Sequence, residues 1–248
     1  MTELPILLLV AATFLLAGGV KGVIGLGLPT VSLAILTATV GLQPAMALLL
    51  VPSFATNLWQ GVVGGNFLTI LKRTWFFLLM ATVTVWLGGL VLVAVDVSWL
   101  SALLGLLLVT YSALSLTRPA VSLPNRWESW AGPLTGTING VLTGMTGSFV
   151  VPGVLYLQAI GLPRDQLIQA MGMLFTVSTV ALAVSLGGQN LLSAELGTIS
   201  IVSVVPAIIG MVLGQKLRQR LSEDKFRKVF FSSILILGLY IIARSLIA

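Results

Sequence analysis

The sequence predicts an all-α polytopic membrane protein made of two inverted repeats, each a broken or re-entrant helix pair followed by three transmembrane helices. Of the 248 residues, 57% are hydrophobic and only 8% are charged. Two glycine-rich stretches interrupt apolar runs, and a short apolar segment follows each of them. Soluble proteins carry about 25% charged residues, so this composition excludes an ordinary soluble domain.

The first interruption is residues 22–29, which hold three glycines and a proline between two apolar runs. Glycine and proline are poor material for a continuous helix, yet the flanks are too apolar for an aqueous loop. A broken helix in lipid is tolerated only where protein covers it or where it lines a wet cavity. A second interruption spans residues 140–148. Two such breaks in matching places of two halves indicate the binding site of a transporter.

The apolar pattern divides the chain into ten predicted segments. They are residues 4–21, 29–40, 44–62, 74–95, 99–116, 129–143, 148–160, 165–186, 198–217 and 229–247. A membrane-spanning helix needs about 20 residues, so segments 29–40 and 148–160 are too short to cross. Each follows a glycine break, and we therefore expect both to be half-helices.

The two halves resemble each other at an offset near 120 residues. The matched pairs are Gly27 with Gly147, Gly41 with Gly161, and Thr56 with Thr176. The order of segments also repeats, with a broken pair followed by three long helices. We therefore predict a first repeat over residues 1–117, a cytoplasmic linker over 118–128 and a second repeat over 129–248.

The distribution of basic residues predicts the orientation in the membrane. Each half has an odd number of crossings, so the halves must be inverted. Lys72 and Arg73 fall in the loop after the third segment, and residues 216–228 form a basic loop in the second half. The positive-inside rule places both in the cytoplasm and both termini outside. The same rule explains the net charge of +6, so a nucleic-acid partner is not needed to account for it. Arg244, near the C-terminus that is predicted to lie outside, is a single basic residue that does not follow the rule. We read the first segment as a retained helix because it lacks a basic region before it and a clear cleavage site.

The residue types restrict the chemistry. The chain has no cysteine and no histidine, so disulfides, thiolate chemistry, the usual zinc sites and a histidine base are excluded. It has no nucleotide-binding motif of the P-loop kind. The one nucleophile and base pair that can be constructed is Ser148 with Lys21. We expect no enzyme and no cofactor, although a membrane-embedded serine hydrolase is the competing reading.

The ionisable groups favour an anion as the transported solute. All seven acidic residues lie near segment ends or in loops, and Lys21 is the clear charge within an apolar segment. A helix that begins inside the membrane presents unpaired N–H groups and partial positive charge to an anion. In inverted repeats the two half-helix N-termini would converge near the midplane. The predicted binding residues are Lys21, Gly25, Gly27, Leu28, Pro29, Asn57, Asn139, Gly144, Thr146, Gly147, Ser148 and Phe149.

Each predicted residue type has a structural alternative. Glycines also allow close helix packing, and Asn57 and Asn139 could form interhelical hydrogen bonds. Lys21 could extend to the cytoplasmic interface. Thr146 or Ser148 could cap the second half-helix.

The motif Gly-Met-Thr-Gly-Ser-Phe-Val-Val-Pro at residues 144–152, together with glycine-rich half-helices in both halves, resembles the TauE/SafE sulfite exporter family. The resemblance runs from about residue 10 to the C-terminus. The first half departs from it, because the family commonly has adjacent glycines where this chain has Gly25-Leu26-Gly27-Leu28-Pro29.

The resemblance implies passage of sulfite, thiosulfate or an organosulfonate across a bacterial cytoplasmic membrane. The expected partners are a small anion and the lipid bilayer, with no nucleic acid. Two other functions stay open: a non-transporting membrane assembly subunit and a carrier of a non-sulfur solute. The direction of transport and assembly into a homo-oligomer also stay open.

Overall fold

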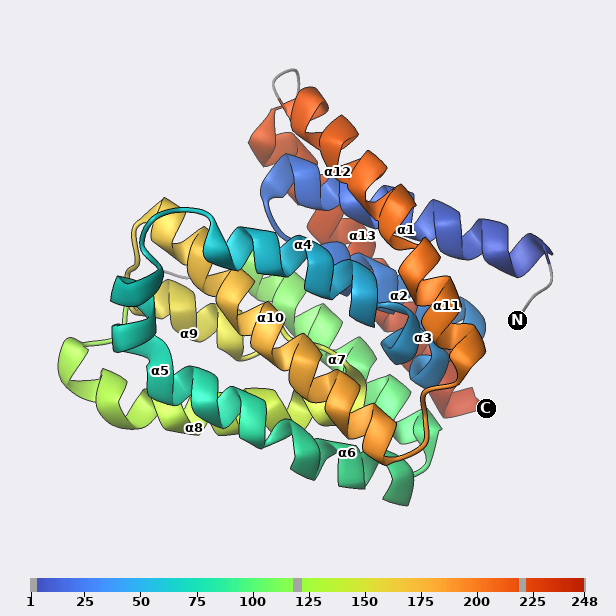
Figure 1. The fold of residues 1–248 in the computed structure, drawn as a ribbon, viewed down its shortest axis with the longest axis horizontal. Coiled ribbons are helices and arrows are strands. Elements are labelled where there is room, and N and C mark those ends of the chain that lie inside the picture. Colours follow the sequence, from blue (N-terminus) through green and yellow to red (C-terminus); the bar gives the residue numbers. More distant parts are fainter. Residues whose placement is uncertain (1–3, 118–121, 219–221, 248) are drawn as a thin grey trace. The chain divides into compact units, whose positions relative to one another are not determined.

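Residues 4–117, 122–218 and 222–247 are described by the structure, which is a computed structural model. All the regular secondary structure in these ranges is helical (Figure 1). The helices are α1 (Leu4–Ile24), α2 (Leu28–Val40), α3 (Leu42–Leu48), α4 (Leu50–Val62), α5 (Phe67–Val83), α6 (Val85–Ala94), α7 (Val97–Thr117), α8 (Asn125–Thr146), α9 (Gly153–Ala159), α10 (Arg164–Gly188), α11 (Ala194–Val202), α12 (Val204–Arg218) and α13 (Glu223–Ile247).

Six helical stretches in the described ranges are long and apolar enough to cross a membrane. They are Leu4–Ile24, Phe67–Ala94, Val97–Thr117, Arg164–Gly188, Ala194–Arg218 and Asp224–Ile247. Helices α3 and α4 form a seventh candidate span that is bent by 45°. The predicted all-helical, multi-pass architecture is thereby confirmed. Helices α2 and α9, with 13 and 7 residues, are too short to span, as expected for half-helices.

Several predicted boundaries are wrong. Lys72 and Arg73 lie within α5 and not in a loop, and the basic residues from Lys225 onward lie within α13. Helix α8 begins at Asn125, inside the predicted linker; residues 118–121 of that linker and 219–221 of the basic loop lie outside the described residues. These helices extend past the apolar pattern because backbone hydrogen bonding continues where the chain leaves the hydrocarbon region.

The chain forms two compact units, each of which combines segments from both halves of the sequence. Unit 1 consists of Met1–Pro52, Asp96–Arg118 and Leu191–Ala248. Unit 2 consists of Ser53–Val95 and Pro119–Asn190. The first glycine break therefore lies in unit 1, and the second lies in unit 2.

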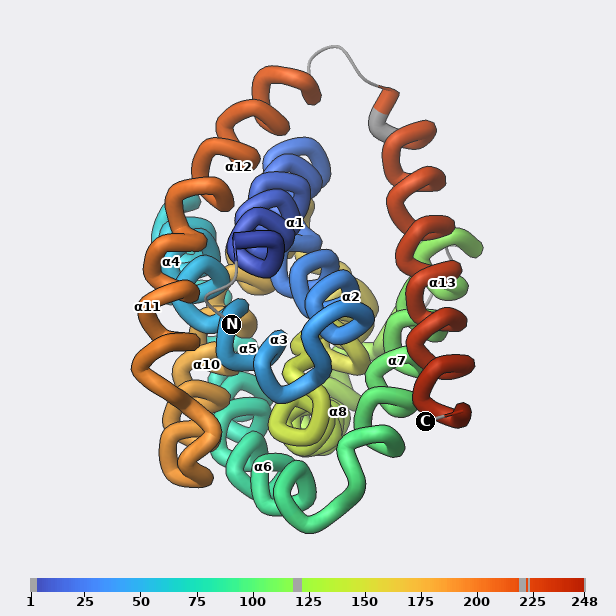
Figure 2. The backbone as a smooth tube through the Cα atoms, turned by 90° about the vertical axis from the view of Figure 1, so that its right-hand side faces the viewer, coloured from blue at the N-terminus to red at the C-terminus, as the bar shows by residue number. Residues whose placement is uncertain are grey.

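In unit 1, α1 lies along α12, α7 lies along α13, and α2 contacts α1, α3 and α13 (Figure 2). Small residues bring the first pair together. A Cβ atom on Gly18 would lie 2.1 Å from the carbonyl oxygen of Ala207, and one on Gly22 would lie 2.2 Å from that of Met211. Contacts advance along both helices together, so α1 and α12 run in the same direction. Close backbone approach of this kind is the usual way to pack helices in lipid.

In unit 2, α8 lies along α5 and α6 through glycines spaced four residues apart. Cβ atoms on Gly136, Gly140 and Gly144 would meet the backbone or side chains of α5 and α6 at 2.4, 2.1 and 2.1 Å. The spacing places these glycines on one face of the helix. One face of helix α8 is thus closely packed, and the helix runs parallel to α5 and α6.

An ion pair joins α5 to the first turn of α8. Arg73 on α5 donates two hydrogen bonds to the Glu128 carboxylate on α8, at 2.9 and 2.6 Å. A third hydrogen bond, of 2.7 Å, runs from Arg73 to the carbonyl of Ile160, just past α9. One guanidinium therefore ties the start of α8 to the end of α9.

Candidate functional site

The first break separates α1 from α2 by three residues, Gly25, Leu26 and Gly27. Both glycines have positive φ values, +80° and +110°. L-residues with a side chain rarely adopt this conformation, so the sequence needs glycine here to reverse the chain. A Cβ atom on Gly25 would meet nothing within 4 Å, whereas one on Gly27 would lie 3.1 Å from Val20 and 3.3 Å from Phe230.

Helix α2 begins inside the protein without a side-chain cap. Leu28, Pro29 and Thr30 are buried at its start, and no side chain accepts a hydrogen bond from its first turn. Proline in the first turn lacks an N–H that would otherwise need a partner. The hydroxyl of Ser32 donates to the Leu28 carbonyl at 2.7 Å, so it is directed back into the helix. The start of α2 is therefore a buried helix N-terminus that carries partial positive charge.

Lys21 lies in the last turn of α1, one turn before this break, and is only 5% exposed. This burial disagrees with the alternative in which its side chain extends to the cytoplasmic interface. Of the charged side chains that the structure describes, Lys21 is the one that is buried. Its amine is a hydrogen-bonding group inside unit 1.

The second break has a different geometry. Gly147 ends α8 in the left-handed conformation, with φ +73°, and its N–H donates to the Thr143 carbonyl at 2.7 Å. Residues 148–152 are irregular before α9 starts at Gly153. The hydroxyl of Thr143 donates to the Ser148 carbonyl at 3.0 Å and holds this irregular segment to α8.

Neither predicted cap is at the start of the second half-helix. Thr146 is the last residue of α8, and its hydroxyl donates to the Leu142 carbonyl at 2.7 Å. Ser148 lies five residues before α9, where Pro152 occupies the N-terminal position without a side-chain cap. Ser148 is 3% exposed and Phe149 is 1% exposed, and the Phe149 ring lies 6.0 Å from that of Phe175. The half-helix predicted over 148–160 is thus shortened to α9 because its first residues carry the chain reversal.

Asn139 links the two sides of the second break. It lies on α8, is fully buried, and its Oδ1 atom accepts a hydrogen bond of 2.9 Å from the N–H of Gly153 at the start of α9. Its Nδ2 atom is buried without a hydrogen-bond partner among the described residues. A buried donor without an acceptor costs about 1–3 kcal/mol. This amide is a polar group at the break that an acceptor would satisfy.

The other predicted residues have identified surroundings. Gly144 is packed against α6, with its Cβ position 2.1 Å from the Val85 carbonyl oxygen, so close helix packing accounts for a glycine there. Asn57 is fully buried on α4 in unit 2.

Sequence reasoning missed one buried amide. Gln169 on α10 donates to the Gly61 carbonyl at 3.0 Å and accepts from the Asn66 N–H at 3.1 Å. Its position inside an apolar segment was the available signal.

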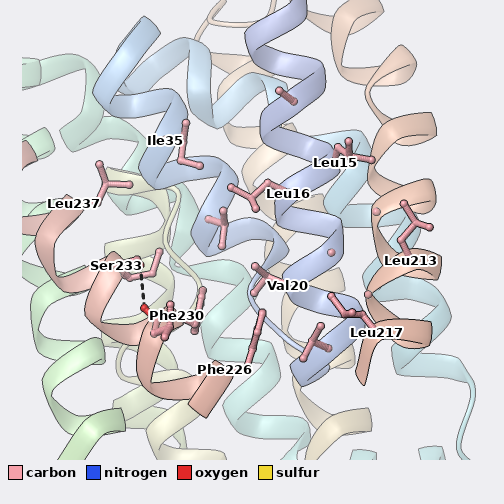
Figure 3. Close-up of a pocket in the computed structure, with 18 residues that line it drawn as sticks. Leu15, Leu16, Val20, Ile35, Leu213, Leu217, Phe226, Phe230, Ser233 and Leu237 are labelled. Carbon is pink, nitrogen blue, oxygen red and sulfur yellow. Dashed lines mark hydrogen bonds between the residues drawn. The ribbon is translucent and has the colours of Figure 1, made fainter. Parts of the chain in front are cut away.

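A large cavity of unit 1 lies beside the first break and is apolar. Its volume is about 560 Å³, and it is lined by α1, α2, α12 and α13 (Figure 3). Leu16, Val20, Phe230 and Leu213 are among the side chains directed into it, and the Ser233 hydroxyl is bonded to the Val229 carbonyl at 2.9 Å. An oxyanion would find no hydrogen-bond donors on such walls. The polar groups of the breaks themselves are the better candidates.

The described residues hold no group of three or more His, Cys, Asp or Glu side chains that could bind a metal ion. What both breaks offer is backbone and amide hydrogen-bond donors in a buried setting, together with one buried lysine in unit 1. Such groups bind anions without covalent chemistry.

Comparison with known proteins identifies the family. Neither the search of curated proteins nor that of solved structures found a match. The model of the family described as sulfite exporter TauE/SafE matches residues 10–241, which covers both breaks and most of the chain. The chain therefore belongs to the TauE/SafE family, whose members are membrane transporters and not enzymes.

Proposed function

We propose that this membrane transporter moves a small sulfur-containing oxyanion, such as sulfite, thiosulfate or an organosulfonate, and that the donors at its glycine breaks bind that anion. The observation that carries the proposal is Asn139. Its Oδ1 atom is occupied by the Gly153 N–H, which leaves the two Nδ2 hydrogens as buried donors at the break. An oxyanion supplies the acceptor that this amide lacks.

The surroundings of Asn139 support an anion rather than a cation. Ser148 and Phe149 are buried within the irregular segment, and the N–H of Gly147 is already bonded to α8. Asn139 therefore adds a side-chain donor at a break where the Gly147 N–H is not available to a ligand. A neutral amide binds an anion weakly enough to permit release, which transport requires.

The first break offers a separate set of donors within unit 1. The uncapped start of α2 presents backbone N–H groups in a buried position, and its dipole favours negative charge by about 0.3–2 kcal/mol. Lys21 lies one turn away on α1 and adds a buried side-chain amine in the same unit. We assign Gly25, Gly27, Leu28 and Pro29 to anion binding through the backbone.

The positions of the acids also support an anion. Asp96, Asp165, Glu195 and Asp224 are exposed and Glu128 is half-buried. Glu3 lies outside the described residues, and the side chain of Glu223 is not described. Carriers that couple to protons or cations commonly use a carboxylate inside the membrane. The described part of this chain offers none there.

The element order supports the proposed inverted repeats. A long helix, a short helix and three further spans occur twice: α1 to α7 and α8 to α13. The matched glycines all have positive φ values: +110° and +73° for Gly27 and Gly147, and +97° and +67° for Gly41 and Gly161. In each unit the first helix of a broken pair packs in parallel with the fourth segment of the opposite half, α1 with α12 and α8 with α5 and α6.

The directions of the helices in unit 1 support termini on the same side of the membrane. Helix α1 runs parallel to α12, and α13 returns after a short connection. The first residue of α1 and the last residue of α13 therefore lie towards the same end of unit 1 (Figure 1). We propose that this end is extracytoplasmic, because the basic residues gather at the other end.

The test is sulfite flux into liposomes that contain the purified full chain. We expect flux above that of protein-free liposomes, and loss of flux in Asn139→Asp, where a negative charge replaces the amide at the break. Asn190→Asp makes the same chemical change at an exposed position and should leave flux unchanged. Flux equal to that of protein-free liposomes, or full flux in Asn139→Asp, would contradict the proposed function.

A further inference from the structure

A small cavity whose lining includes several polar residues lies in unit 1, away from the glycine break. Its volume is about 180 Å³, and it is enclosed by the end of α2, the first turn of α7 and the last turns of α13. Arg244, Thr37 and Ser101 are among its lining residues. This polar lining differs from the apolar walls of the larger cavity in the same unit.

Arg244 lies at the end of α13 where the positive-inside rule does not predict a basic residue. Lys225 and Lys228 lie near the start of α13, whereas Arg244 lies in its last turn. Helix α13 has 25 residues, so the two ends are separated by about 37 Å. The positive-inside rule accounts for one end of this helix and leaves the cation at the other end unexplained.

The Arg244 guanidinium has donors to spare. It donates to the carbonyl of Ala38 at the end of α2, and it forms no ion pair with a carboxylate of the described residues. A guanidinium has five N–H donors and prefers planar or tetrahedral oxyanions. The bond to Ala38 orients Arg244 beside the cavity and leaves further N–H groups available.

Thr37 provides an independent observation that points to a ligand. It is 7% exposed, lines the cavity, and its Oγ1 atom is buried without a hydrogen-bond partner among the described residues. By contrast, the neighbouring Thr39 hydroxyl bonds back to the Ile35 carbonyl of its own helix at 2.8 Å. The Thr37 hydroxyl therefore lacks a partner in a residue that lines the same cavity as Arg244.

Asp96 lies next to the lining residue Val97 in the sequence, but its carboxylate is not part of the cavity lining. The Asp96 carboxylate is exposed and accepts the Ser98 N–H at 2.7 Å, at the start of α7. The Ser98 hydroxyl also bonds to Asp96, and the Ser245 hydroxyl bonds to the Ile241 carbonyl at 2.7 Å. We therefore assign the cavity donors to Arg244, Thr37 and Ser101.

A purely structural explanation covers only part of these facts. Arg244 could act solely as a cap for the last carbonyls of α2, a common role of arginine at helix ends. That role uses the bond to Ala38 but gives no reason for the unpaired Thr37 hydroxyl or for the space between the two side chains.

We infer that this cavity is a second binding site, for one small oxyanion, held by the Arg244 guanidinium and the hydroxyls of Thr37 and Ser101. It lies at the end of unit 1 that holds both the start of α1 and the end of α13. An anion captured there would be concentrated at one membrane surface. The choice of sulfite as the first probe rests on the proposed function, whereas the site itself does not.

The test is titration of the purified full chain in detergent with sodium sulfite, followed by calorimetry, with sodium chloride at matched ionic strength as the reference. The background is Asn139→Asp, which removes the proposed amide donor at the second break. We expect Arg244→Gln to weaken sulfite binding by about tenfold or more, as for a charged hydrogen bond, and Thr37→Val by about two- to tenfold. Lys225→Gln removes an exposed charge from the other end of α13 and should change the affinity less than about twofold.

The melting temperature without anion separates a binding role from a structural one. Thr37→Val replaces an unpaired buried hydroxyl by a methyl group of similar shape, so it should leave the ligand-free melting temperature equal or higher. A lowered melting temperature with unchanged sulfite affinity would overturn the inference, as would unchanged affinity in Arg244→Gln. Should Arg244→Gln fail to fold, Thr37→Val alone decides between these results.

The outcomes also distinguish this site from the proposed function. Sulfite binding that depends on Arg244 without any flux would contradict the transport of sulfite and leave this site in place. Sulfite flux together with a sulfite affinity that ignores both Arg244 and Thr37 would overturn this site and leave the transport function in place.

Discussion

Gly144 on α8 and Gly88 on α6 meet backbone to backbone: a Cβ atom on Gly88 would lie 2.8 Å from the Cα atom of Gly144. The helix that leads into the second break is therefore fixed against its neighbour with no side chain between them. Such contacts replace the hydrophobic driving force that lipid does not provide between helices. The irregular segment of the break is thus held on a rigid support.

Gly144→Ala should destabilise the protein by about 1–3 kcal/mol, the usual effect of overpacking. The added Cβ atom would lie 2.1 Å from the Val85 carbonyl oxygen, and backbone atoms cannot move aside cheaply. Thermal unfolding in detergent measures the change. Gly197→Ala on α11 is the matched control, because nothing lies within 4 Å of its Cβ position, and it should be neutral or stabilising. Equal unfolding temperatures for the two variants would contradict the packing role of Gly144.

Thr143→Val should loosen the second break. The variant keeps the shape of the side chain but loses the 3.0 Å hydrogen bond to the Ser148 carbonyl, which then stays buried without that donor. We expect a loss of about 1–3 kcal/mol in stability, measured by thermal unfolding. Thr135→Val serves as the control, since the Thr135 hydroxyl bonds only to carbonyls of its own helix. A larger loss for the control would argue against a fastening role of Thr143.

Gly27→Val should abolish sulfite flux, whereas Gly25→Ala should retain much of it. Both positions have positive φ values, but only a side chain at Gly27 would meet Val20 and Phe230, at 3.1 and 3.3 Å. The Gly25 substitution adds backbone strain of about 1–2 kcal/mol without crowding. Flux in liposomes is the measurement, and the folded state is checked by size-exclusion chromatography. Full transport by the double variant Gly27→Val, Gly147→Val would refute a role of the breaks in the anion path.

Asp96→Asn and Asp165→Asn should keep transport within a few-fold of the parent. Both carboxylates are exposed at helix ends. Hydrogen bonds from the backbone and then the side chain of Ser98 lower the pKa of Asp96, so this group stays ionised at neutral pH and carries no proton. Flux is measured at several values of external pH. Loss of flux in either folded variant would mean that a carboxylate takes part in coupling.

Cysteine labelling tests the orientation, because the natural chain has no cysteine. Asp96→Cys and Lys225→Cys each place one thiol at an exposed position. An impermeant maleimide added to intact cells should label the first variant and spare the second. Labelling of Lys225→Cys with protection of Asp96→Cys would reverse the proposed orientation.

Much of the architecture could be predicted from residue patterns. The short segment 29–40 is matched by α2, and the glycines expected to break the helices have the positive φ values that such breaks need. Hydrophobicity and glycine conformation are local properties, so a pattern along the chain reports them. Helix ends were less accurate, as at Arg73, because hydrogen bonding continues past the last apolar residue.

The candidate sites could be predicted only in part. The motif at residues 144–152 locates the second break, but nothing in the chain indicates that Asn139 bonds to Gly153 fourteen residues away while its Nδ2 atom stays unpaired. Nor does the sequence around Arg244 indicate that its side chain bonds to the end of α2, which lies 206 residues earlier in the chain. Contacts between distant segments depend on which helices pack together.

By itself the sequence determined that this chain is a multi-pass helical membrane protein with two glycine breaks and with neither cysteine nor histidine. Only the tertiary structure decided which glycines pack helices and which turn the chain. It also decided that each compact unit draws on both halves of the sequence, and which polar atoms are left without partners. The physical reason is that composition and local backbone preference are written along the chain, whereas the satisfaction of a buried donor depends on the neighbours that folding brings to it.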